Sequence, residues 1–167
     1  MRKMFLSVIL LVMCIFLFFG CSKSGAPSCT GKDVKKLVIS ISTDELKNQL
    51  ARIYNLHMNM GKYYKDPGEA LASFLTMTYD DLKKLKDANN KNEEAVKVLD
   101  KAIADIDQDL ANMHLDNIRI NDVNDKIKKC DCSSDLIASN GNKIPITYTG
   151  QFNDKGELYV EVFGLKK

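Results

Sequence analysis

The chain has 167 residues and a formal net charge of +2, so it has the length of one ordinary domain and nearly balanced charge. The sequence contains no basic stripe interleaved with aromatic residues, which excludes the usual nucleic-acid-binding surface. It contains no glycine-rich phosphate loop after a predicted strand, and His57 and His114 lie in no recognisable catalytic setting. These features predict a protein that is not an enzyme and that uses no cofactor.

The first residues have the composition of an export signal. Arg2 and Lys3 precede an almost unbroken apolar run from Met4 to Phe19. This run is shorter than the roughly 18 to 20 residues of most membrane-spanning helices, and no positive stop-transfer cluster follows it. We therefore expect a cleaved signal over residues 1–20, with an uncleaved N-terminal anchor as the alternative.

The end of this run, Leu17-Phe18-Phe19-Gly20-Cys21, resembles a bacterial lipobox. The resemblance implies that the mature protein begins at Cys21, has no net charge, and is held to a membrane by acyl chains on this cysteine. Two or three chains give durable anchoring, whereas a single chain binds only marginally. Ser22 replaces the Asp of an inner-membrane retention signal, so the resemblance favours the outer membrane in a cell that has two. Residues 21–28 are predicted to be a flexible tether before a single domain over residues 29–167.

Three cysteines remain in the mature domain besides the acylated one, in a compartment that permits disulfides. We predict a bridge from Cys29 to Cys132. Cys130 is the competing partner, because on a strand it points to the same face as Cys132. Metal binding by this pair is not expected, because neither histidine has a ligand-like spacing to it.

The first half of the domain is predicted to be helical. A capping box at Thr30 and Asp33 begins a helix over residues 32–54. A proline after Asp66 begins a short helix with a predicted buried side of Ala70, Leu71, Phe74 and Leu75. Thr78 with Asp81 caps another short helix.

A longer helix is predicted from about residue 91, because apolar residues recur there in steps of three and four. The stripe consists of Val96, Leu99, Ile103, Ile106, Leu110 and Met113. We expect this stripe to pack on a sheet, with a dimer seam as the alternative.

In the second half of the domain, apolar and polar residues alternate with the two-residue period of β-strands. Predicted strands cover residues 117–122, 126–138, 143–152 and 158–163, and the connections between them are short. One connection is Asn140-Gly141, which is a strong hairpin signal. Short connections join antiparallel neighbours, so we predict an α+β domain in which N-terminal helices pack on a C-terminal antiparallel meander of about four strands.

Several segments of this half resemble a group of small, largely uncharacterised bacterial envelope lipoproteins. They are Cys132-Ser133-Ser134-Asp135-Leu136, Pro145-Ile146-Thr147-Tyr148-Thr149 and Gly156-Glu157-Leu158-Tyr159-Val160-Glu161-Val162. The resemblance covers Cys29 to Leu165 apart from the helical middle. It implies a curved sheet wrapped on a helix, similar to nuclear-transport-factor-2-like or cystatin-like folds, and it carries no catalytic residues.

The predicted function is therefore that of a lipid-anchored, non-catalytic module of the cell envelope that binds a protein or peptide. The candidate contact residues are Tyr148, Phe152, Tyr159 and Phe163, whose alternative role is to fill the core. The alternative function is a periplasmic small-ligand carrier with a pocket between the sheet and the long helix.

Overall fold

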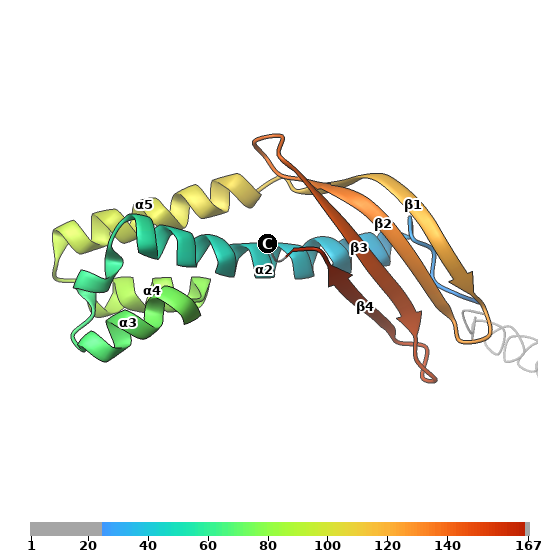
Figure 1. Ribbon diagram of the computed structural model, residues 1–167, viewed down its shortest axis with the longest axis horizontal. Helices are drawn as coiled ribbons and strands as arrows, with labels where there is room; N and C mark the ends of the chain where they lie inside the picture. Colours follow the sequence, from blue (N-terminus) through green and yellow to red (C-terminus); the bar gives the residue numbers. More distant parts are fainter. Residues whose placement is uncertain (1–24, 166–167) are drawn as a thin grey trace, which may run out of the picture.

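The computed structural model describes residues 25–165; the predicted signal and the predicted acylation site, Cys21, lie outside the described residues. In this range four α-helices and one 3-10 helix precede a four-stranded antiparallel sheet, which confirms the predicted α+β class (Figure 1). The elements are α2 (Lys32–His57), η1 (Met60–Tyr63), α3 (Pro67–Thr76), α4 (Tyr79–Ala88), α5 (Glu93–Leu110), β1 (His114–Asn124), β2 (Lys129–Ile137), β3 (Lys143–Phe152) and β4 (Leu158–Phe163). Among the described helices, none combines the length and the apolar composition needed to cross a bilayer.

Helix α2 extends from the sheet into the helical half of the molecule (Figure 1). Its first half lies on the sheet and buries Val34 and Val38, which are one helical turn apart and so share a face. Its second half packs among the other helices, where the side-chain amide of Asn55 donates to Ser73 Oγ of α3 at 3.0 Å. The helix ends at His57 and is one turn longer than predicted.

The short helices begin as predicted, but one of them buries a different face. At the start of α4, Thr78 Oγ1 accepts from the Asp81 N–H and the Asp81 carboxylate accepts from the Thr78 N–H, so the capping box is present. The prediction that Leu71 and Leu75 of α3 are buried is wrong, since these side chains are 71% and 81% exposed. Helix α3 instead turns Ser73 toward α2, and its leucines point to solvent.

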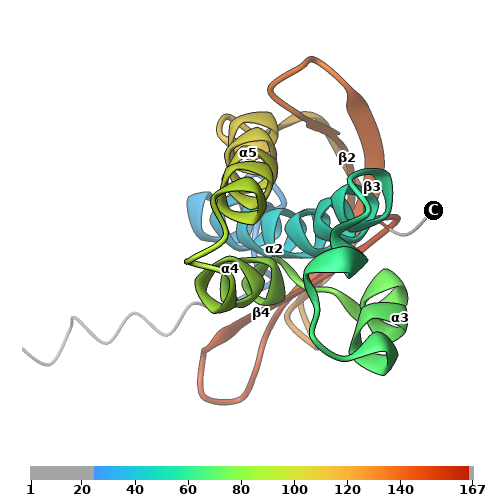
Figure 2. The same ribbon diagram turned by 90° about the vertical axis from the view of Figure 1, so that its left-hand side faces the viewer.

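Helix α5 packs on α2 and α4, and not on the sheet as expected from its stripe (Figures 1 and 2). Leu99 and Ile106 are fully buried in this contact. The opposite side of the helix is polar, and Lys86 of α4 pairs with Asp100 at 2.9 Å across the surface. The stripe meets helices because α5 lies alongside the second half of α2, which extends away from the sheet (Figure 1).

The four strands lie in the order β1-β2-β3-β4, each antiparallel to the next, which is the predicted meander. Strand β1 is longer than predicted and contains two irregularities, between Asp116 and Arg119 and between Ile120 and Asp122. Asn117 lies at the first of them with φ of +52°, a conformation that asparagine tolerates better than most residues. The β1–β2 turn therefore falls at residues 125–128 and not at 123–125, between the predicted strands.

The sheet buries one face against α2. Alternate residues of β2 and β3 point toward the helix, as the two-residue period of a strand requires. The buried members are Cys130, Cys132, Ser134, Leu136, Ile146, Tyr148, Gly150 and Phe152. The other face is the outer face of the sheet.

Candidate functional site on the outer face of the sheet

Strand β4 places two aromatic side chains on the outer face of the sheet. Tyr159, Glu161 and Phe163 alternate with the inward residues of this strand, and the two aromatic side chains are 59% and 52% exposed. The register sets Tyr159 opposite Gln151 and Glu161 opposite Thr149 of β3. Half-exposed aromatic rings on a rigid strand offer a partner a large apolar contact area at little cost in conformational entropy.

These aromatic residues line a hollow of about 560 Å³ on β2, β3 and β4. Its polar lining is held in place by side-chain contacts. Thr149 Oγ1 donates to Asp131 Oδ1 at 2.6 Å, and Lys129 Nζ lies 3.0 Å from Asp131 Oδ2. The Thr149 hydroxyl and the Lys129 ammonium hold the pKa of Asp131 below its ordinary value. Gln151 Nε2 donates to the Ile127 carbonyl at 3.2 Å. We call this surface, made by Lys129, Asp131, Thr149, Gln151, Tyr159, Glu161 and Phe163, the aromatic face.

Two of the four aromatic residues predicted to contact a partner are not on this face. Tyr148 and Phe152 point toward α2 and are only 1% and 8% exposed, so their prediction as surface contacts is wrong and they fill the core. The Tyr148 hydroxyl donates to the Cys29 carbonyl at 3.0 Å, and burial raises the pKa of Tyr148 to about 12. The physical reason is strand alternation, which places these two β3 residues on the face opposite to Tyr159 and Phe163.

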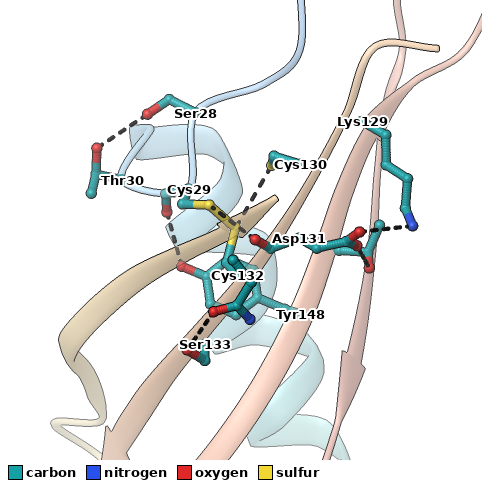
Figure 3. Close-up of a disulfide and its surroundings, with 11 residues drawn as sticks. Ser28, Cys29, Thr30, Lys129, Cys130, Asp131, Cys132, Ser133 and Tyr148 are labelled. Carbon is teal, nitrogen blue, oxygen red and sulfur yellow. Dashed lines mark hydrogen bonds and ion pairs between the residues drawn. A yellow bond between two sulfur atoms is a disulfide. The ribbon is translucent and has the colours of Figure 1, made fainter. Parts of the chain in front are cut away.

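A cluster of three sulfur atoms lies between the first described segment and β2 (Figure 3). Cys29 and Cys132 form the disulfide that we predicted, and Cys130 is a buried free thiol whose Sγ lies 3.7 Å from Cys132 Sγ. Burial raises the pKa of the Cys130 thiol, which disfavours the reactive thiolate. The three Sγ atoms lie within 4.8 Å of one another. Since two of them are bonded to each other, the cluster is a covalent link between the start of the domain and its sheet.

The histidines form no catalytic arrangement in the described part of the chain. His57 is exposed at the end of α2, and His114 is exposed at the start of β1 with its Nδ1 3.2 Å from the Asn112 carbonyl. Among residues 25–165, neither ring forms a hydrogen bond or an ion pair with a carboxylate or a thiol. The arrangement lacks the paired base and orienting acid of a nucleophilic enzyme.

Among the residues that the structure describes, two of the other hollows lie away from the aromatic face. One of about 550 Å³ lies between α3 and α4 and is lined by apolar side chains that include Met77 and Leu85. The other, of about 320 Å³, lies between the start of α2 and the β3–β4 end of the sheet, where Val34, Phe152 and Leu158 line it. Neither the α3–α4 hollow nor the polar lining of the aromatic face was predicted from the sequence, because both depend on how side chains of neighbouring helices or strands meet in space.

Comparisons of the chain with models of protein families, with curated proteins and with solved structures find no match.

Proposed function

We propose that this protein is a lipoprotein of the bacterial cell envelope that binds a protein or peptide partner through the aromatic face of its sheet. The observation that carries the proposal is the pair Tyr159 and Phe163, two aromatic side chains about half exposed beside a hollow with ordered polar groups. Exposed aromatic residues of this kind are enriched where proteins bind one another. The role is non-catalytic, and acyl chains on Cys21 hold the protein to a membrane, the outer membrane in a cell that has two.

Two features support a location outside the cytoplasm. The lipobox-like sequence ends at Cys21, and Cys29 and Cys132 form a disulfide, a bond that persists in oxidising compartments and is rare in the cytosol. Expression of the full chain in bacteria fed labelled palmitate tests the anchor. We expect label on the wild-type protein and none on the Cys21→Ser protein, which should keep its signal. Equal labelling of the two proteins refutes the assignment.

The aromatic face is tested by cross-linking in intact cells, with a photoreactive amino acid in place of Glu161. We expect one discrete adduct, which disappears when Tyr159 and Phe163 are both replaced by alanine. The matched control replaces Leu71 and Leu75, which are also exposed but lie on α3. An adduct that persists in the aromatic double variant, or that is lost equally in the leucine control, refutes the proposal.

A second candidate function is that of a periplasmic small-ligand carrier. The predicted pocket lay between the sheet and the long helix, α5, which packs on other helices and not on the sheet. A hollow of about 320 Å³ lies instead between the start of α2 and the sheet, and it favours this function because small-molecule pockets begin at about this size. Elsewhere between α2 and the sheet, buried side chains such as Tyr148 and Leu136 fill the space. Native mass spectrometry of the protein isolated from envelope extracts tests this second function. A carrier should be isolated with a bound molecule, and a Val34→Phe substitution should displace that molecule.

A further inference from the structure

The first described residues are attached to the β1–β2 turn. The Ala26 N–H donates to Asp125 Oδ1 at 2.9 Å, and Gly25 lies directly beside the same carboxylate. Only three residues, 22–24, lie between the predicted acylation site Cys21 and Gly25, so four residue-to-residue steps join the two Cα atoms. A chain of four residues spans at most about 14 Å. An acylated Cys21 would therefore keep the β1–β2 turn within this distance of the membrane surface.

The turn carries apolar and basic side chains on an ordered backbone. Asn124 Oδ1 accepts from the N–H groups of Lys126 and Ile127, and the Lys128 N–H donates to the Asp125 carbonyl. Ile127 is 53% exposed at the tip. Val123, near the end of β1 that leads into the turn, is 50% exposed as well. An isoleucine between lysines is the chemistry that suits a bilayer surface, since the apolar side chain enters the interface and the ammonium groups meet lipid phosphates.

The acidic residues nearest to the tip are engaged by other groups. Asp125 accepts from Ala26, and Asp131 is held by Lys129 and Thr149. Asp122 lies opposite Asp131 in the register, so it belongs to the outer face and not to the tip. Residues 125–128 have formal charges of +1 on Lys126, +1 on Lys128 and −1 on Asp125, so the turn has a net formal charge of +1.

We propose that the β1–β2 turn is a membrane-contact surface that docks on anionic phospholipid headgroups, with Ile127 in the interface and Lys126 and Lys128 on the phosphates. This inference rests on the proposed lipid anchor at Cys21. It also gives the molecule an orientation, because α3 and α4 lie at the opposite end of its long axis (Figure 1). The helical end then points away from the bilayer.

The chain contains no tryptophan, so a single introduced indole reports on its own position. Lipidated Ile127→Trp protein is reconstituted in vesicles of phosphatidylethanolamine and phosphatidylglycerol whose acyl chains are brominated. We expect a blue-shifted emission that the bromolipids quench. The matched control is Leu75→Trp at the far end, which should show neither effect. Replacing Lys126 and Lys128 by glutamate in the Ile127→Trp protein should lower the fraction of molecules whose turn contacts the bilayer by at least about fivefold per lysine. The midpoint of thermal unfolding should stay unchanged.

Vesicle flotation and the mass of the N-terminal peptide distinguish a failure of the proposed docking surface from a failure of the proposed lipid anchor. A protein that is acylated and floats, but whose Ile127→Trp emission is neither shifted nor quenched, overturns the docking surface and leaves the anchor standing. A protein without acyl chains that stays off the vesicles overturns both. Emission that shifts only when envelope proteins are added assigns the turn to a protein partner and overturns the lipid contact.

Discussion

Replacing Cys29 by alanine tests the disulfide, which has the largest single expected effect on stability. The bridge joins residues separated by 103 positions. On the chain-entropy model, closing a loop of that length stabilises the folded state by about 4.7 kcal/mol. Most domains are stable by only about 5 to 15 kcal/mol. For a domain of this length, the loss lowers the midpoint of thermal unfolding by about 15 °C.

The position of Cys130 determines how the other cysteine variants behave. In the Cys132→Ala protein, Cys130 can pair with Cys29, since their sulfur atoms lie within 4.8 Å, and much of the loop constraint is kept. In the Cys29→Ala protein, a bond between the two remaining cysteines closes no long loop. In the Cys130→Ala protein the native bridge remains, and we expect a loss of about 1 kcal/mol from the buried sulfur. The expected order of destabilisation is therefore Cys130→Ala, then Cys132→Ala, then Cys29→Ala.

Urea denaturation of the three variants with and without dithiothreitol measures these effects, together with mass spectrometry of non-reduced peptides. Reduction should destabilise the wild-type protein to the level of Cys29→Ala and should leave Cys29→Ala unchanged. A native peptide that joins Cys29 to Cys130, or a Cys130→Ala protein as unstable as Cys29→Ala, would refute the assigned pairing.

Three smaller predictions concern single positions. Gly150→Ala should destabilise the protein by about 1 to 3 kcal/mol in urea denaturation, because its Cβ would lie 3.2 Å from Cys130 Sγ; an unchanged midpoint contradicts this contact. Ser42→Ala should stabilise the protein by about 1 kcal/mol, because within the described residues its buried hydroxyl has no hydrogen-bond partner; a loss of stability would reveal a partner. Asp131 has a lowered pKa, so its contribution to stability is present above about pH 4 and is lost as the pH falls through the folded-state value. Asp131→Asn should flatten that part of the curve of stability against pH. A variant curve identical to that of the wild-type protein would show that Asp131 makes no such contribution.

Local signals in the sequence predicted the order and type of the elements. The capping box at Thr78 and Asp81 and the turn at Asn140-Gly141 depend on residues at most a few positions apart, so they are readable without the fold. The short connections between strands likewise implied the antiparallel meander. Alternation on β2 placed Cys130 and Cys132 on one face, which limited the bridge to two pairings.

Only the tertiary structure decided which faces are covered. Tyr148 and Tyr159 have the same chemistry and lie on adjacent strands, yet α2 covers the first and leaves the second exposed. Leu71 points to solvent because α3 meets α2 through another side, and the α5 stripe meets helices and not the sheet. Periodicity shows that one face of an element is apolar, whereas the burial of that face depends on how distant elements pack together.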